Sequence, residues 1–173
     1  MSHDYRPEWD YEVDRRPLKA VRDLVDLYLF DDSVATSRGA HGEVLRELGI
    51  ERPTVHYVTG LAEGKHLAKF VSGTSSAPVI VVDTRAMRAA EREYGVSLDT
   101  VVESTLLHEY GHAFVESVGA ELDDEEGVVE RFAHYVWETR DYEGGVRDLR
   151  IAAEGIVPID RGRGGDGEIE ARP

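Results

Sequence analysis

The sequence predicts an α+β fold in which a small three-stranded sheet, antiparallel or mixed, packs on a central helix and on the helix that follows it. Strand-like runs occupy 54–58, 66–72 and 77–83, and turn-forming residues separate them. Apolar residues recur at helical spacing over 97–118 and again over 125–140. A sheet followed by two amphipathic helices is typical of a two-layer α+β domain.

Length and composition favour one soluble domain. The chain has 173 residues, 41% of them hydrophobic, and no cysteine, so it can build one core but neither a disulfide framework nor a thiolate metal site. The longest apolar run, 78–82, is far shorter than the roughly 20 residues that cross a bilayer. The charged N-terminus does not resemble a secretory signal. We therefore expect a cytoplasmic protein with no membrane partner.

The charge balance bears on the class of partner. The formal net charge is −15 at pH 7, and phosphate recognition needs an excess of lysine and arginine. We therefore expect no nucleic-acid partner. The sequence does not indicate the oligomeric state.

The N-terminal half contains fold signals without evident chemistry. Residues 1–16 are predicted to form an extended arm, and a helix is predicted to begin at Pro17, with apolar residues at helical spacing to Leu29. A shorter helix is expected over 42–48, ended by Gly49. The spacing of the three strands suggests an antiparallel meander, followed by an exposed helix over 84–94.

The central predicted helix covers 97–118. Ser97 is a natural N-cap, Asp99 lies in the first turn and Gly119 follows the end. Its apolar residues cover most of its girth, which is typical of a buried helix. After the next helix, the domain is expected to end near 158, so that one domain covers 17–158 and residues 159–173 form a disordered tail.

The central helix carries His108-Glu109-Tyr110-Gly111-His112, an H-E-x-x-H pattern. Histidines at i and i+4 lie one turn apart on one helix face, so both imidazoles can reach one tetrahedral ion. Glu109 lies about 100° round the helix, where it can accept a proton from an attacking water. The pattern predicts a Zn²⁺ site with His108 and His112 as metal ligands and Glu109 as the catalytic base.

Two further observations weigh against a chance motif. Two histidines and a glutamate are costly to place on a mostly apolar helix unless they have a purpose. A glycine inside a helix, Gly111, costs about 1 kcal/mol relative to alanine. We therefore expect another element to pass close to the helix at Gly111.

A catalytic zinc needs a third protein ligand and an open fourth position. Position 118 is valine, so the spacing of a third histidine in the metzincin pattern is not met. Carboxylates of the next helix are the alternative, and the candidates are Glu125, Glu126 and Glu130, with His134 a further possibility. Helical phase alone does not choose among them.

The motif helix, followed by an acidic residue on the next helix, resembles the gluzincin metallopeptidases of the zincin class, and in particular the small ImmA/IrrE-type peptidases. The resemblance covers about residues 77–140. It implies a zincin-like fold and zinc ligands at His108 and His112. It also implies a catalytic glutamate at Glu109 and a downstream ligand that matches Glu130 best. The chain differs from that family in the predicted helix between strand and motif.

The same resemblance implies that an edge strand, 77–83 or 66–72, pairs with an extended peptide substrate. It also implies a group that stabilises the oxyanion, for which the candidates are His56, Tyr57, His134, Tyr135 and Tyr142. Asp141 is one acid that could orient a ligand histidine.

The sequence therefore predicts a zinc-dependent metallopeptidase that acts on a peptide or protein substrate. One alternative is a non-catalytic zinc-binding regulatory or interaction protein that retains the fold. Another is an interaction module in which the motif is coincidental and the acidic surface binds a basic partner.

Overall fold

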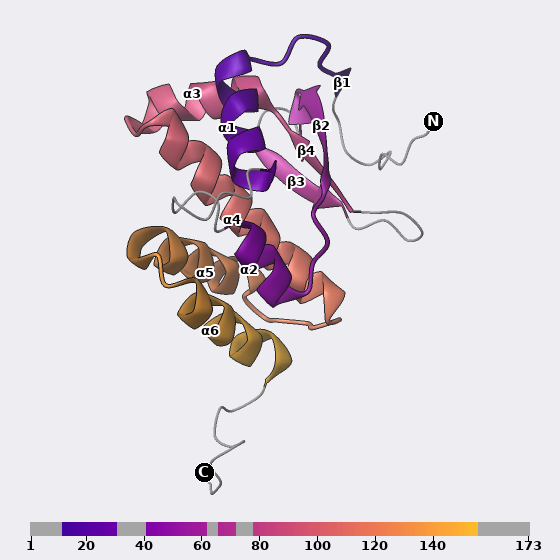
Figure 1. Cartoon of the computed structure of the whole chain (residues 1–173), viewed down its shortest axis with the longest axis vertical. Coiled ribbons are helices and arrows are strands. Elements are labelled where there is room, and N and C mark those ends of the chain that lie inside the picture. The colour runs from indigo at the N-terminus through magenta and orange to yellow at the C-terminus, as the bar shows by residue number, and fades with distance from the viewer. Residues whose placement is uncertain (1–11, 31–40, 62–65, 72–77, 156–173) are drawn as a thin grey trace, which may run out of the picture.

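The computed structural model describes residues 12–30, 41–61, 66–71 and 78–155, and this part of the chain has an α+β fold (Figure 1). It contains a four-stranded mixed sheet and six helices. In chain order the elements are β1 (Glu12–Val13), α1 (Lys19–Phe30), α2 (His41–Leu48), β2 (Thr54–Thr59), β3 (Ala68–Val71), β4 (Val79–Val82), α3 (Thr84–Tyr94), α4 (Leu98–Ser117), α5 (Glu125–Thr139) and α6 (Tyr142–Glu154).

The strand order is β1-β2-β4-β3. β4 pairs parallel with β2 and antiparallel with β3, and β1 pairs antiparallel with β2. The antiparallel meander suggested by strand spacing is therefore wrong, because β4 inserts between β2 and β3 and leaves β3 at the edge. A fourth strand, β1, comes from the end of the expected extended arm. The rest of that arm, 1–11, and the expected tail, 159–173, lie outside the described residues.

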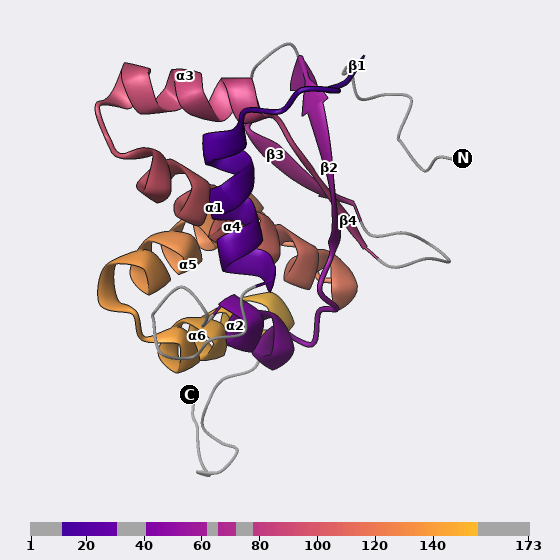
Figure 2. The same ribbon diagram turned by 45° about the horizontal axis from the view of Figure 1, so that its top comes forward.

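Side chains of β4 alternate between the two faces of the sheet. Ile80 and Val82 belong to the main core beneath the helices, while Val81 packs with Val58 and Leu61 on the opposite face. In both ribbon views the helices lie to one side and the sheet to the other (Figure 2). A β-branched strand buried on both faces is what a central position in a mixed sheet requires.

The central helix α4 lies in the middle of the helical layer, in contact with α1, α3, α5 and the edge strand β3. It begins where the sequence predicts, with the Ser97 hydroxyl accepting a hydrogen bond from the Thr100 amide. Leu106, Leu107 and Tyr110 are fully buried. The histidine motif is therefore carried by the helix with the most neighbours, which fixes its position.

Helix α6 was not predicted from the sequence. Asp141 caps it by accepting the Gly144 amide, and Gly155 ends it at φ 65°. Two glycines in its first turn weaken the helical pattern, yet they have a packing reason. A Cβ at Gly145 would run into the side chain of Val136 on α5, so this glycine lets the two helices approach.

A buried polar network lies on the side of α4 away from the two motif histidines. His41, the first residue of α2, is fully buried. Its Nδ1 lies 3.0 Å from the Tyr110 hydroxyl and its Nε2 lies 3.0 Å from Glu103 Oε2. A neutral imidazole that accepts from Tyr110 and donates to Glu103 satisfies all three groups.

Glu103 is the centre of this network. Besides His41, its carboxylate accepts a hydrogen bond from the Arg140 guanidinium. The Tyr28 hydroxyl of α1 donates to Asp99 of α4 and lies 3.4 Å from Glu103 Oε1. Arg140 ends α5 in the left-handed region, at φ 60°, and is the only non-glycine residue with positive φ in the described chain. Glu103 therefore joins α1, α2, α4 and the C-terminal end of α5.

The network shifts the titration of its members. Burial lowers the pKa of His41 below its usual 6.5, against the opposing effect of Glu103. Burial by itself would raise the pKa of Glu103, but the hydrogen bonds from His41 and Arg140 outweigh burial and lower it. Asp99 and Arg140 are the other charged groups near His41. Because both pKa values are lower in the folded state, the unfolded chain binds more protons than the folded one as the pH falls. The free energy of unfolding therefore decreases on acidification.

We expect a His41→Gln variant, which has no titratable group at position 41, to lose the part of this pH dependence that His41 contributes. Below pH 6.5 the unfolded wild-type chain binds a proton that the buried imidazole rejects, so the advantage of the wild type over the variant shrinks on acidification. The slope of that difference reaches at most about 1.4 kcal/mol per pH unit for one proton. Urea unfolding of both proteins between pH 7.5 and 5.0 measures it. If the difference in unfolding free energy did not change with pH, His41 would not have the lowered pKa described above. The motif histidines are present in both proteins, so their contributions cancel in the difference.

Candidate metal centre

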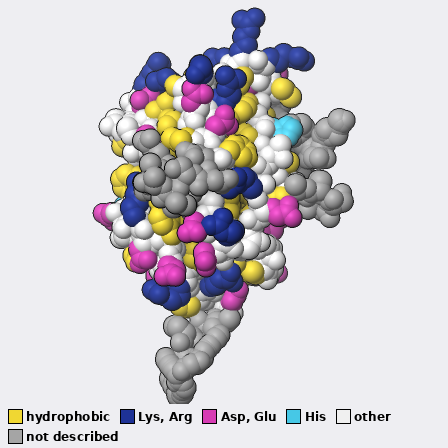
Figure 3. Space-filling model, in the orientation of Figure 1, with side chains coloured by type: hydrophobic (Ala, Val, Ile, Leu, Met, Phe, Trp, Pro, Cys, Tyr) yellow, Lys and Arg dark blue, Asp and Glu magenta, His cyan; other side chains and the backbone are white. Residues whose placement is uncertain are grey.

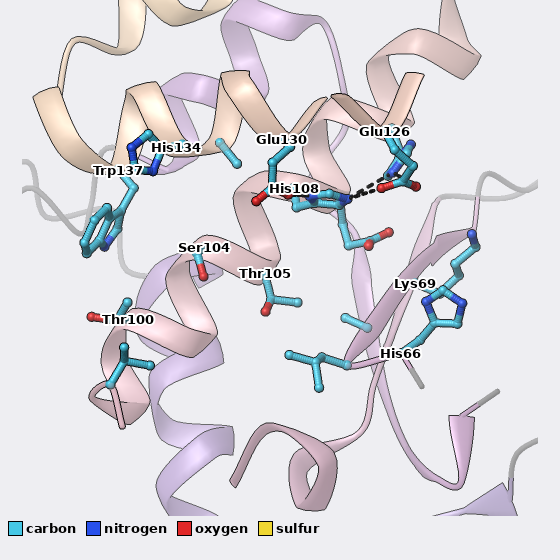
Figure 4. Close-up of a pocket in the computed structure, with 16 residues that line it drawn as sticks. His66, Lys69, Thr100, Ser104, Thr105, His108, Glu126, Glu130, His134 and Trp137 are labelled. Atoms are coloured by element: carbon cyan, nitrogen blue, oxygen red, sulfur yellow. Dashed lines mark hydrogen bonds and ion pairs between the residues drawn. The ribbon is translucent and has the colours of Figure 1, made fainter. Parts of the chain in front are cut away.

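The two motif histidines lie on one face of α4, where His108 points toward α5 (Figure 4) and His112 contacts both His108 and Glu126 of α5. Their Nε2 atoms lie 3.1 Å apart, and their side chains are 22% and 17% exposed. This is the arrangement that i, i+4 spacing predicts. Both rings are held by the helix backbone yet remain open to solvent on one side.

The first turn of α5 brings a carboxylate to both rings. Glu126 Oε1 lies 3.1 Å from His108 Nε2, and Glu126 Oε2 lies 2.9 Å from His112 Nε2. In the described residues, His108, His112 and Glu126 form a group whose potential ligand atoms all lie within 4.8 Å of one another. Two atoms bound at about 2.0–2.1 Å to a tetrahedral zinc are themselves roughly 3.3–3.4 Å apart, so little adjustment is needed to fit an ion.

The other nitrogen of each ring also faces a carboxylate. His108 Nδ1 lies 3.2 Å from Glu130 Oε1, and His112 Nδ1 lies 2.6 Å from Glu125 Oε2. A carboxylate at Nδ1 holds the proton there and leaves a lone pair on Nε2. Two lone pairs and the anionic oxygens of Glu126 then converge on one point, an arrangement that a cation stabilises.

This geometry divides the roles of the three acidic candidates. The prediction from the sequence made Glu130 the third ligand, whereas in the structure Glu130 contacts the Nδ1 side and Glu126 contacts both Nε2 atoms. The reason is the antiparallel crossing of α4 and α5, which places the first turn of α5, capped by Asp124, over the motif. His134 is 64% exposed and pairs with Glu138, away from the cluster.

Gly111 sets the separation of the two helices. A Cβ built at Gly111 would lie 2.9 Å from Val129 Cγ1 and 3.4 Å from Phe132 Cδ2, both on α5. Val129 is fully buried and one turn from Glu126, so it has little room to move. The expected close approach at Gly111 is confirmed, and it brings Glu126 within reach of the histidines.

Glu109 lies at the inner wall of the site and is 7% exposed. Its Oε1 accepts a hydrogen bond from the Phe70 amide of β3 at 3.0 Å. Burial raises the pKa of Glu109, and the nearby histidines and the Phe70 amide oppose that shift in part. A glutamate with a raised pKa is a stronger base than an exposed one, and the strand holds it in place.

The site opens into a groove of about 500 Å³ between α4, α5 and the start of β3. Figure 4 shows the groove running from His66, Lys69 and Glu126 at one end, past His108, to Thr100 and Trp137 at the other. Sequence reasoning missed Thr100, Ser104 and Trp137 as groove residues. Their spacing held the signal, because Thr100 and Ser104 precede His108 by two turns and one turn of α4.

The candidates for oxyanion stabilisation separate in the structure. Of the five, only His134 lines the groove, together with His66, which the sequence did not single out. The Tyr135 hydroxyl donates to Asp141 at 2.6 Å, so Asp141 orients a tyrosine and caps α6 rather than supporting a ligand histidine. Tyr57 lines a separate hollow between α1 and β2.

Comparison of the chain with protein-family models, with curated proteins and with solved structures finds no match. The resemblance to zincins therefore rests on the motif, its helix and the acidic helix that follows. In the described part of the chain, no helix is long and apolar enough to cross a membrane. On the face shown in Figure 3, acidic and basic side chains are interspersed.

We expect Gly111→Ala to destabilise the protein through Val129. Overpacking a buried contact costs about 1–3 kcal/mol, against a helix-propensity gain of about 1 kcal/mol. Val129→Ala makes room for the new methyl, so the double variant should be more stable than the sum of the two single changes implies. Urea unfolding of the four proteins gives the coupling energy. Strict additivity would mean that Gly111 does not set the helix separation.

Proposed function

We propose that the protein is a zinc-dependent metallopeptidase in which His108, His112 and Glu126 hold the metal and Glu109 is the general base. The observation that carries the proposal is the convergence of two imidazole Nε2 atoms and one carboxylate, with ligand atoms within 4.8 Å, beside a buried glutamate. Two histidines and one carboxylate are the ligand set of several catalytic zinc sites. The chain has no cysteine that could make the site a thiolate one, and this absence fits a cytoplasmic setting.

The residues of the chain fit that ion. Three protein ligands would leave one coordination position for water or substrate. Glu125 and Glu130 contact the Nδ1 atoms of the two rings, where they would keep the rings oriented. When bound, zinc supplies Lewis acidity and lowers the pKa of a coordinated water toward about 7.

Glu109 performs the proton transfers in this proposal. Its Oε1 is fixed by the Phe70 amide, and no hydrogen bond to Oε2 is found among the described residues, so Oε2 is the atom for the reaction. It accepts a proton from the attacking water and later delivers it to the leaving amine. A purely structural zinc site would not require a buried carboxylate beside the ligands, which favours catalysis over a non-catalytic zinc protein.

The edge strand gives the substrate a backbone partner. β3 pairs with β4 alone among the described strands, whereas β4 is internal, so β3 (68–71) rather than β4 (79–82) is the edge. The Asp83 amide donates to the Leu67 carbonyl, which makes Leu67 a hydrogen-bonded position and turns the amide and carbonyl of Ala68 outward. Ala68 lines the groove, where an extended peptide can add to the sheet.

Metal content tests the ligand set. We expect near one zinc per chain in the wild type by elemental mass spectrometry after reconstitution and desalting, and almost none in His112→Ala. Glu126→Gln should lose most of the metal, because it removes an anionic ligand, while Glu130→Gln should weaken binding by about 10–100-fold as an outer partner does. A wild-type protein without zinc would remove the basis of the proposal. Loss with Glu130→Gln but not with Glu126→Gln would restore Glu130 as the ligand.

Glu109→Gln tests the catalytic role separately. We expect this variant to keep its zinc and to lose hydrolysis of a mixed peptide library by a factor of at least about 100, the lower range for general-base catalysis. The wild type and Glu109→Gln are compared at equal zinc content, which removes metal loss as an explanation. Hydrolysis that survives in the zinc-loaded variant would be incompatible with Glu109 as the base.

A further inference from the structure

The groove has two chemically different ends because α4 and α5 run antiparallel. Residues on the groove face of α4 recur every turn, from Thr100 and Ser104 to the motif histidines. On α5 the order is reversed, so Glu126 and Glu130 face the histidines, whereas Trp137 lies at the end with Ser104 and Thr100 (Figure 4). Ala133, one turn before Trp137, also lines the groove. One end of the groove therefore holds the metal ligands, and the other, here called the distal end, holds none of them.

The distal end is lined by Val96, Thr100, Ser104, Ala133 and Trp137. No aspartate, glutamate, lysine or arginine lines it among the described residues. Val96 is 41% exposed and Ala133 only 5%, so the end is open at its mouth and closed at its base. His134 also borders it, with its Nε2 turned toward Glu138 at 3.2 Å.

The position of the distal end suits one side chain. Ser104 and Thr100 precede His108 by one and two turns of α4, or about 6 and 12 Å along the axis. An extended peptide advances about 3.4 Å per residue, so the residue next to a bond held at the metal can reach this end with its side chain. Ser104 and Ala133 have small side chains, and Trp137 lies at the far limit of the groove (Figure 4).

We propose that the distal end is a specificity subsite for a large uncharged side chain, aromatic or long aliphatic, next to the scissile bond. This deepens the proposed function and rests on it. An indole face and methyl groups bind such a side chain by burying its apolar surface. A charged side chain would lose its hydration there without an ionic partner.

The acidic residues at the metal end suggest the opposite substrate class, peptides with basic side chains. Glu126 and Glu130 are 75% and 73% exposed at their side chains and already face the histidines. Exposed carboxylates with imidazole partners select weakly for a cation. The distal end, with its buried base at Ala133, is the stronger determinant, and the two classes give different cleavage patterns.

The first experiment digests a proteome-derived peptide library with the zinc-loaded enzyme and maps the cut sites by mass spectrometry. We expect phenylalanine, tyrosine, leucine and methionine to be enriched at one position beside the cut, and charged residues to be depleted there. Enrichment of lysine and arginine at that position, or no preference at all, would overturn the subsite while leaving the peptidase in place.

Variants then assign the preference to residues. Trp137→Ala should lower kcat/KM for a phenylalanine-containing cleaved peptide, relative to its alanine analogue, by roughly tenfold or more. Ala133→Leu fills the base of the subsite and should shift the preference toward alanine. Arg131→Ala, on the same helix but outside the groove, is the matched control and should leave the ratio unchanged. An unchanged ratio in both Trp137→Ala and Ala133→Leu would exclude the distal end as the determinant.

A binding measurement separates the subsite from catalysis. The chain has two tryptophans, at positions 9 and 137, so Trp9→Phe/Glu109→Gln leaves Trp137 as the only indole in a protein designed not to hydrolyse. Capped hexapeptides of alanine with one central phenylalanine or one central lysine serve as probes. We expect saturable quenching or shift of Trp137 emission with the first and not with the second. If the phenylalanine probe changes Trp137 emission but the wild type cuts no peptide, the subsite is supported and the peptidase is rejected. If the wild type hydrolyses peptides but the phenylalanine probe has no effect on Trp137 emission, the subsite is rejected.

Discussion

The close contact between α4 and α5 at Gly111 is the constraint on which the candidate site depends. His108 and His112 are supplied by one helix, but their carboxylate partner comes from another, and Val129 would meet any larger residue at position 111. Glycine lowers the stability of the helix at this position, but its lack of a side chain lets the two backbones approach. The same crossing forms one wall of the groove. Because the helices run antiparallel, the residues that line the groove differ between the end with the histidines and the distal end.

The buried network around Glu103 also connects α4 to α5, on the side of α4 opposite the histidines. Arg140 adopts a backbone conformation that costs a non-glycine residue about 1–3 kcal/mol, and its guanidinium is bonded to a carboxylate that is 3% exposed at its side chain. Removing one partner from such a network leaves a buried charge without compensation. The C-terminal end of α5 is thus tied to α4 through charge, while its middle is tied through packing at Val129.

Much of the helical layer was predictable because periodicity and caps are local signals. Ser97 as N-cap, the extent of α4 and the position of α3 follow from the sequence and are confirmed. Strand pairing is not local, so nothing near β4 indicates that it inserts between β2 and β3. Helix α6 was missed because Gly144 and Gly145 break its pattern, and their packing reason is visible only with α5 in place.

The site shows the same division between local and non-local information. His108, Glu109 and His112 are identified by their spacing along one helix. The third ligand depends on where a second helix crosses the first, and a displacement of one turn exchanges Glu126 for Glu130. Both lie on the same face of α5, so helical phase cannot distinguish them. Trp137 was missed for the same reason, because it joins the groove only through the crossing of the two helices, whereas the spacing of Ser104 before His108 was a local signal.

The position of Glu126 in the first turn of α5 has a consequence for the lifetime of the protein. The first turn is where a helix frays most easily, and here it carries Glu125 and Glu126 beside other acids of 121–124. Glu125 and Glu126 contact His112 and His108, so local opening of this turn breaks those contacts and exposes a short acidic stretch. If zinc binds as proposed, the ion joins that turn to the central helix α4, and ligand binding to the folded state opposes opening. The concentration of available zinc would then determine how long the chain survives, as well as whether it acts.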